Sequence, residues 1–533
     1  MRSETAVQAS IGGVSHCRVL LVALVAMSLF VAAGSAKAMT VQQQQILNQT
    51  GVAASDSFGY SVALSADGNT AIIGAASPLN GGPQGSATIF TRTSGAWTQQ
   101  QVITRTNPES NDCFGCAVAM SADGNTAIIG AYGATVNGHL DQGSATIFTR
   151  SGNAWTQQQT ISQSNGAADD WFGISLALSS DGNTAIIGAS DANVGRQLSQ
   201  GRATVFTRSG ARWTQQKTIT RNNGAAMECF GSSVALSSDG NTAIIGAAFA
   251  SVGGKFGQGN ATIFTRSGTR WTQQKTITQT NGAVGDSFGN SVALSSSGNT
   301  AIIGASQATV GGKSNQGSAT VFTRSGTRWT QQKTITEKNG AANDNFGNSV
   351  ALSADGNTAI IGANAAALYD KPTGLGSATI FTRSASRWTQ QKKIPQAKGA
   401  AGLYFGYSVA LSSDGYTTII SANGATAAGN AGPGSATVYT LQTLPSTPRN
   451  VSATNGVSAA SVVSWRAPAK TGGSPITGYA VTASPGGASC SWTSGPHSCT
   501  VSGLTNGVAY TFTVKATNAM GTSAASPPSK PTK

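Results

Sequence analysis

Six acidic residues recur at one position of this chain, and their spacing suggests a shared role. Each stands two residues before a phenylalanine, and the six are Asp56, Asp112, Asp170, Glu228, Asp286 and Asp344. A seventh copy of the pattern has Leu403 instead. If the copies close into a ring, the carboxylates form a site for a cation or for the hydroxyl groups of a ligand. The alternative is structural, because a short acidic side chain where a loop becomes a strand accepts backbone N–H bonds.

Five aromatic residues in the same connections have side chains that suit ligand contact: Tyr132, Trp171, Phe256, Tyr369 and Tyr404. Exposed aromatic rings stack on sugars or anchor a protein partner. We therefore add them to the six acidic residues as candidate ligand-binding residues. The set is not repeated from copy to copy, which argues against a repeated lectin site.

The cysteines predict disulfides rather than redox catalysis. Cys113 and Cys116 have redox-motif spacing, but no helix start is predicted there to lower a thiol pKa, so we expect a local disulfide or two buried thiols. Cys490 and Cys499 lie nine residues apart in a strand–turn–strand pattern, and we expect them to pair. Cys229 occupies the repeat position of Cys113 two units away, too far to bridge. At least one free thiol is therefore expected.

Other catalytic residue sets are missing from the sequence. Beyond the first 38 residues the only histidines are His139 and His497, in different predicted domains, and no Gly-x-Ser-x-Gly elbow or metal-spaced His/Cys cluster occurs. Carboxylates spread one per repeat unit are too far apart for a glycosidase pair. We expect a non-enzymatic binding protein without a cofactor or metal. The alternative is an exported glycan hydrolase with acidic residues at the centre of the ring.

The elements that must position these residues form seven copies of a unit of about 58 residues. Each unit has a Phe-Gly pair, at Phe58, Phe114, Phe172, Phe230, Phe288, Phe346 and Phe405. A unit reads as four strands, typified by SVALS, TAIIGA, SATIFTR and WTQQKTIT, with an Asp-Gly hairpin turn between the first two. The first strands of the unit carry small apolar residues that can be buried, and the fourth carries polar residues that suit an exposed edge. This order is typical of a propeller blade. The last unit lacks its fourth strand, and residues 40–47 match that strand, so we expect them to close the ring.

The connections divide the expected ring into two faces. The turns SADGNT and SGTR hardly vary and share one face, where Asp67, Arg92 and their equivalents are interpreted as structural, as is Trp97 with its equivalents. The connections on the other face differ in sequence and length. A uniform scaffold with divergent loops favours the loop side as the binding face, and neutral drift of the loops is the alternative.

Residues 40 to 442 resemble the FG-GAP repeats. The resemblance rests on the seven Phe-Gly pairs and on IIGA segments with Gly74, Gly130, Gly188, Gly246, Gly304 and Gly362. It implies the seven-bladed propeller of integrin alpha subunits and many exported bacterial proteins. Some integrin-type blades bind calcium, but loops here such as SQATVGGKSNQG lack three regularly spaced oxygen ligands. The calcium sites of the family are therefore not expected.

The C-terminal part resembles a fibronectin type III domain. The resemblance rests on Trp465 in VVSWRAP, on GGSPITGYAV and on LTNGVAYTFTVKATNAMGTS, in which Tyr510 occupies the tyrosine-corner position. It implies a spacer or adhesive module without chemistry of its own.

The whole chain is therefore predicted to be all-β, a seven-bladed β-propeller followed by a fibronectin type III β-sandwich. We expect a signal peptide at 1–38, the propeller at 39–443 and the sandwich at 444–533. The signal peptide implies a secreted, extracellular or periplasmic protein without a transmembrane anchor. The net charge of +14 suits an anionic partner or only a solvated surface. We expect a monomer that binds an extracellular protein or glycan, and no specific nucleic acid.

Overall fold

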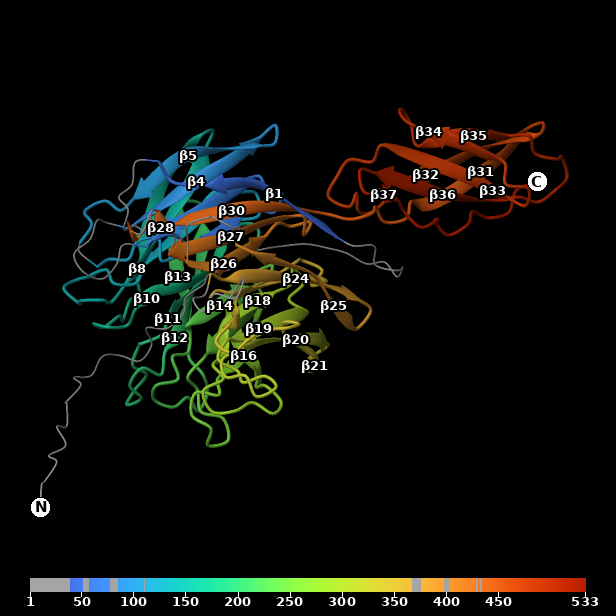
Figure 1. Ribbon diagram of the computed structural model, residues 1–533. Helices are drawn as coiled ribbons and strands as arrows, with labels where there is room; N and C mark the ends of the chain where they lie inside the picture. Colours follow the sequence, from blue (N-terminus) through green and yellow to red (C-terminus); the bar gives the residue numbers. More distant parts are fainter. Residues whose placement is uncertain are drawn as a thin grey trace, which may run out of the picture.

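The computed structural model describes residues 39–50, 57–76, 85–109, 111–366, 375–396, 403–424, 426–427, 430–431 and 434–533. The predicted signal peptide at 1–38 lies outside these residues. Seven four-stranded antiparallel sheets form the blades of a propeller, and a separate sandwich follows them (Figure 1). The predicted all-β fold is thus confirmed. The described residues contain no helix that is long and apolar enough to cross a membrane.

The first strands of neighbouring blades contact one another and so surround the central axis. They are β2 (Phe58–Leu64), β6 (Ala117–Met120), β10 (Phe172–Leu178), β14 (Ser233–Leu236), β18 (Phe288–Leu294), β22 (Phe346–Leu352) and β26 (Leu403–Leu411). The second strands are β3 (Thr70–Ala75), β7 (Thr126–Ala131), β11 (Thr184–Ala189), β15 (Thr242–Ala247), β19 (Thr300–Ala305), β23 (Thr358–Ala363) and β27 (Thr417–Gly424).

The third and fourth strands lie progressively further from the axis. The third strands are β4 (Ser86–Thr93), β8 (Ser144–Ser151), β12 (Arg202–Ser209), β16 (Asn260–Ser267), β20 (Ser318–Ser325), β24 (Ser377–Ser384) and β30 (Ser435–Gln442). The fourth strands of blades 1 to 6 are β5 (Ala96–Thr104), β9 (Ala154–Ile161), β13 (Arg212–Ile219), β17 (Arg270–Ile277), β21 (Arg328–Ile335) and β25 (Arg387–Pro395). Two short strands, β28 (Thr426–Ala427) and β29 (Asn430–Ala431), pair within the last blade.

The ring closes as predicted, because a strand from the N-terminal end of the propeller completes the last blade. Strand β1 (Thr40–Leu47) pairs antiparallel with β30, from Thr40 opposite Gln442 to Leu47 opposite Ala436. It therefore supplies the outer strand of blade 7, whose order is β1-β30-β27-β26. Leu47 is buried among residues of blades 1 and 7, so closure adds core as well as hydrogen bonds.

The phenylalanines of the Phe-Gly pairs form the core of the blades. All are buried, and most pack edge-on against an aromatic ring of the third strand, as Phe172 does against Phe206 with ring centroids 6.0 Å apart. Such edge-to-face contacts favour the packing of aromatic rings. A fixed ring in each blade explains why the sequence keeps this residue in every copy.

The C-terminal domain is a sandwich of two sheets. One holds β31 (Arg449–Val457), β32 (Ala460–Arg466) and β35 (Ser498–Ser502), and the other holds β33 (Gly478–Ser484), β34 (Ser489–Trp492), β36 (Thr511–Asn518) and β37 (Gly521–Thr522). The expected disulfide between Cys490 and Cys499 joins the two sheets. The hydroxyl of Tyr510 accepts a hydrogen bond of 3.1 Å from the Thr505 N–H, which is the predicted tyrosine corner.

Candidate functional site

The aspartates of the constant turns hold the turns themselves. Asp239 accepts hydrogen bonds from the Ser237 hydroxyl, from the Asn241 backbone N–H at 2.9 Å and from the Asn241 amide at 3.0 Å. Burial raises the pKa of this carboxyl, but the hydrogen bonds from Ser237 and Asn241 outweigh it and hold the pKa below its usual value. The nearby Arg266 donates to the Asn241 side chain at 2.9 Å. This face is a structural network, as predicted.

The repeated tryptophans pack between blades. Trp213 donates its ring N–H to Gln158 of the preceding blade at 2.9 Å, and its backbone N–H to Gln159 at 2.8 Å. The guanidinium of Arg208 lies over its ring, 5.6 Å from the centroid. These contacts confirm the structural interpretation of the tryptophan set.

The centre of the ring on the constant-turn side offers little room. Backbone hydrogen bonds link the turns of successive blades, for example from the Ala122 N–H to Ser180 and from the Ser180 N–H to Ser238. The cavity that they surround has a volume of about 30 Å³ and is lined mainly by alanine, leucine and serine. It holds two or three water molecules at most by volume, since one water needs about 10–15 Å³.

The acidic residues before the phenylalanines bind nearby arginines or backbone N–H groups. Asp112 is paired with Arg105, Asp170 with Arg202 and Glu228 with Arg221, and all three carboxylates are buried. The remaining described members accept backbone N–H bonds of 2.7 Å, Asp286 from Ala283 and Asp344 from Ala341. Burial raises the pKa of Asp286. Asp56 lies outside the described residues, and the geometry of the other five favours the structural interpretation.

The aromatic candidates have different surroundings. The prediction that Trp171 is exposed is wrong: it is 7% exposed and packs against Tyr132, with ring centroids 5.5 Å apart. Its positive φ of 57° turns the chain so that the ring joins the core of blade 3. Tyr132 is half-buried, whereas Phe256 and Tyr404 are exposed, and Tyr369 lies outside the described residues.

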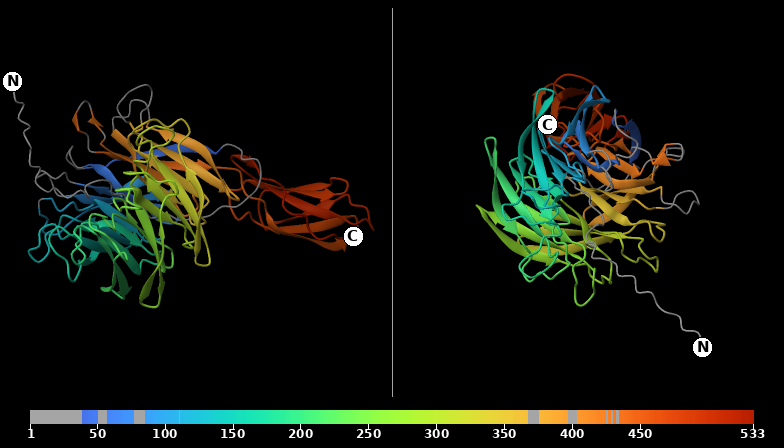
Figure 2. Two further views of the ribbon diagram at one scale, coloured as in Figure 1. Left: turned by 90° about the horizontal axis from the view of Figure 1, so that it is seen from below. Right: turned by 90° about the vertical axis from the view of Figure 1, so that its left-hand side faces the viewer.

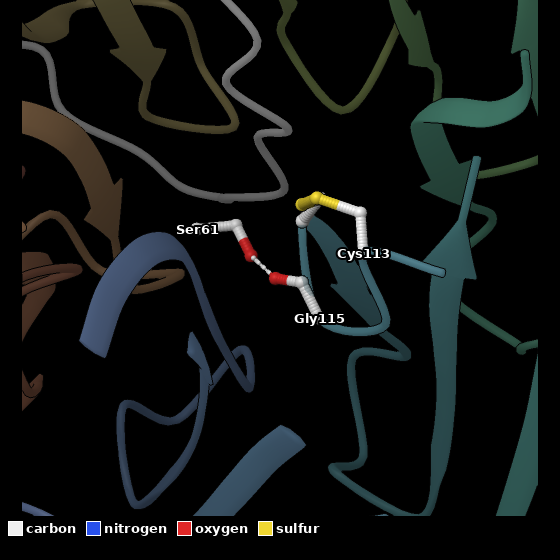
Figure 3. The surroundings of a disulfide bond; sticks show 4 residues. Ser61, Cys113 and Gly115 are labelled. Carbon is white, nitrogen blue, oxygen red and sulfur yellow. Dashed lines mark hydrogen bonds between the residues drawn. A yellow bond between two sulfur atoms is a disulfide. The ribbon is translucent and has the colours of Figure 1, made fainter. Parts of the chain in front are cut away.

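The cysteine pair of blade 2 forms a disulfide at the inner end of the loop face. Cys113 and Cys116 are joined and buried, and Figure 3 shows their bond beside the hydrogen bond from Ser61 to Gly115. The partly buried rings of Tyr60 and Tyr132 pack against the pair. The expected free thiol is not found, because the described residues include no free cysteine.

The loops of blades 2 to 5 share one shape despite their different sequences. In each, a valine pairs with the residue three positions later, as in Val252 with Lys255 and Val310 with Lys313. The Lys255 ammonium donates to the carbonyl of Gly282 at 2.6 Å, which ties the loop to the connection into the next blade. The sequence signal for this was the recurrence of valine every 58 residues, at 136, 194, 252 and 310.

These loops and the connections that follow them carry exposed apolar side chains that the sequence analysis did not identify, except for Phe256. Leu140, Leu198 and Phe256 occupy the same position in blades 2, 3 and 4, and they are 67%, 65% and 53% exposed. Met227 and Val284, in the connections that follow, are also exposed. We call these five residues the apolar arc. The signal that could have found the arc was again the spacing of 58 residues.

Comparisons with known proteins agree with the fold. The FG-GAP repeat family model matches residues 41–90, 97–148, 155–206, 213–264, 271–322, 329–381 and 388–439, and the fibronectin type III model matches 446–532. No curated protein is detectably similar in sequence.

Solved structures that resemble the chain are distant in sequence. Hydrazine synthase of Kuenenia stuttgartiensis is 15% identical with a TM-score of 0.45, over 71% of this chain and 97% of that one. The periplasmic gluconolactonase PpgL of Pseudomonas aeruginosa is 14% identical with a TM-score of 0.43, over 63% and 84%. The WD40 repeats of RRP9 are 11% identical with a TM-score of 0.46, over 76% and 100%.

Proposed function

Since the chain belongs to the FG-GAP repeat family and carries a fibronectin type III domain, we propose that it is a non-enzymatic binding protein. Its partner, a protein or glycan, binds to the loop face of the propeller. FG-GAP repeats and fibronectin type III domains are often modules for binding and adhesion. The C-terminal domain then serves as a stalk that presents the loop face.

The placement of the C-terminal domain is the observation that carries this proposal. It docks on the constant-turn side, where the Lys470 amine lies 3.5 Å from the Asp355 carboxylate in the turn of blade 6. Asn518 donates to the Thr443 carbonyl at 2.9 Å, and the Thr40 hydroxyl lies 3.3 Å from the Met520 sulfur. The domain extends away from that side, opposite the loops of blades 2 to 5 (Figures 1 and 2).

Export is part of the proposal. Two disulfides, Cys113–Cys116 and Cys490–Cys499, suit an oxidising compartment. A signal peptide at 1–38 would direct the chain there, and this remains a prediction because those residues lie outside the described part. A secreted, extracellular or periplasmic location is consistent with both.

The alternative, a glycan hydrolase, has less support. Its general acid and base would have to come from the acidic residues before the phenylalanines. The described members of that set are buried against arginines or backbone N–H groups, so they are poorly placed to meet a substrate.

Blocking one face at a time tests the proposal. A cysteine is introduced at exposed Ser314 on the loop face or at exposed Ser267 in a constant turn, and each is coupled to a bulky polyethylene glycol. Binding is measured on a glycan array and on immobilised surface proteins, with chromogenic glycosides as a test for turnover. Loss of binding only with the label at position 314 supports the proposal. Equal binding by both labelled proteins, or glycoside turnover, contradicts it.

A further inference from the structure

We propose that the apolar arc, together with the basic side chains around it, docks an acidic protein segment that carries apolar anchor residues. The inference rests on the proposed function of the loop face and names the site and the chemistry of its partner.

Exposed apolar side chains are concentrated on these loops. Among the described residues eight large apolar side chains are exposed, and five of them form the arc: Leu140, Leu198, Met227, Phe256 and Val284. Exposed apolar residues that gather on one part of a soluble protein mark interaction surfaces, whereas scattered single ones need no explanation. The loops that carry them lie on the side away from the C-terminal domain (Figure 2).

Hydrogen bonds to the next connection hold the arc in place. The carbonyl of Leu198 accepts the Met227 N–H at 2.8 Å, so these two arc residues are neighbours across a blade seam. In the same way the carbonyl of Phe256 accepts the Gly285 N–H at 3.0 Å, next to Val284. An ordered surface loses less conformational entropy when it binds. The pairs Leu198 with Met227 and Phe256 with Val284 are therefore preorganised on successive blades.

The exposed charges beside the arc residues of blades 3 and 4 are positive, whereas at the blade 2 end the exposed Asp169 donates its backbone N–H to the Leu140 carbonyl at 2.9 Å. On the loops and connections of blades 3 to 5 the exposed ionisable side chains are Arg196, Lys255, Lys313 and Lys338. The acidic residues of the same segments are all buried: Asp191, Glu228, Asp286, Glu337 and Asp344. Positive side chains next to Leu198, Met227, Phe256 and Val284 are complementary to an acidic partner and accelerate its association at low salt.

A protein segment fits this surface better than a glycan or a lipid bilayer. The arc has one aromatic ring, that of Phe256, so it offers little for stacking on sugars. It contains neither tryptophan nor tyrosine, the residues that favour the bilayer interface. Leucine, methionine and phenylalanine side chains instead resemble the apolar core of protein interfaces, and the lysines and arginine resemble a polar rim.

The experiment selects peptides from a random phage-displayed library on the full-length protein and measures the affinity of the synthesised peptides by fluorescence anisotropy. We expect the selected peptides to combine Asp or Glu with Leu, Phe or Trp. The double variant Leu198→Ser/Phe256→Ser should weaken binding at least tenfold, and Lys255→Glu/Lys313→Glu should do the same at low salt. Val462→Ser is the control, since Val462 is an exposed apolar residue of the other domain.

Each other outcome has a definite meaning. Neutral or basic peptides, or peptides whose affinity ignores both double variants, overturn the inference. If the label at position 314 still abolishes the binding of such peptides, the proposed function of the loop face is kept and only the inference about the apolar arc is rejected. The protein is also tested on vesicles of phosphatidylserine and phosphatidylcholine. If no peptide is selected and vesicle binding depends on Leu198 and Phe256, the inference is overturned and the arc binds a membrane.

Discussion

The hydroxyl of Ser175 in blade 3 donates a hydrogen bond of 2.8 Å to the carbonyl of Gly231 in blade 4. Gly231 is the glycine of a Phe-Gly pair and has a φ of +96°. A Cβ on Gly188 in β11 would lie 2.0 Å from the same carbonyl oxygen. The glycines of the Phe-Gly and IIGA motifs therefore meet at the blade seam, where only glycine permits this approach. The motif is explained by assembly of the ring and needs no ligand.

We expect Ser175→Ala to lower stability. The change leaves the Gly231 carbonyl without its buried donor, which costs about 1 kcal/mol. Blade 2 offers the matched reciprocal change, because Ala117 stands where most blades have this serine. Ala117→Ser should restore a bond to Gly173 and raise the melting temperature. Differential scanning calorimetry measures both melting temperatures. If both variants shift the melting temperature in the same direction, the hydrogen bond across the seam is not the source of the effect.

The blades and their closure were predictable because their determinants are local or repeated. An Asp-Gly turn between two apolar strands specifies a hairpin by itself, and seven copies of one unit multiply that signal. The match between residues 40–47 and the fourth strand predicted the pairing of β1 with β30. One detail differs: in blades 2 and 4 the first strand begins at Ala117 and Ser233, three residues after the phenylalanine.

Removing residues 39–48 should sharply lower the melting temperature. Strand β1 completes blade 7, and its loss exposes the edge of β30 and the pocket that Leu47 fills. Loss of the buried leucine side chain alone costs about 2–5 kcal/mol. A milder variant, Leu47→Ala, should fall between wild type and the deletion. An unchanged melting temperature for the deletion would mean that the ring does not depend on this strand.

The constant turn of blade 5 lacks the aspartate of the other turns, so the residues at this position in blades 4 and 5 can be exchanged by mutation. Ser297 stands where most turns have aspartate, and it accepts the Asn299 N–H at 3.3 Å, against 2.9 Å for Asp239 and Asn241. Ser297→Asp should stabilise the protein, and Asp239→Ser should destabilise it, each by about 0.5 kcal/mol after solvent screening.

The pH dependence of this exchange has a definite sign. The pKa of Asp239 is lowered in the folded state, so its contribution is present above the unfolded pKa and is lost as the pH falls through the folded value. The two variants should therefore differ from wild type at pH 7, and each difference should be smaller at about pH 3, below the unfolded pKa of about 3.9. Urea denaturation at both pH values measures the difference, and an equal effect at both would exclude a charged carboxylate as its source.

The candidate site was less predictable than the fold, because side-chain exposure in a loop depends on contacts from other blades. From the sequence we predict that Trp171 is exposed, yet contacts with Tyr132 bury it. Leu140 and Leu198 read as ordinary apolar residues of variable loops. Their exposure follows from backbone bonds to the next connection, such as that from Met227 to Leu198, which no local pattern reveals. Only the 58-residue register could have linked them to Phe256.

The junction of the two domains should strengthen as the pH rises. Lys470 is 8% exposed there, and burial lowers its pKa to about 6. In the unfolded chain the amine binds a proton up to about pH 10.5, whereas the docked amine is neutral above about 6. The unfolded state therefore binds more protons between these values, and stability increases with pH across that window.

Lys470→Met isolates this effect, because it keeps an apolar stem of similar length and removes the titrating amine. From pH 6 to pH 9 the melting temperature of wild type should rise by several degrees relative to the variant, because one proton bound only in the unfolded state contributes at most about 1.4 kcal/mol per pH unit. Asp355→Asn is the matched control: it removes the carboxylate 3.5 Å away but leaves the buried amine, so the upward slope should persist. Parallel curves for wild type and Lys470→Met would show that Lys470 stays protonated in the docked state.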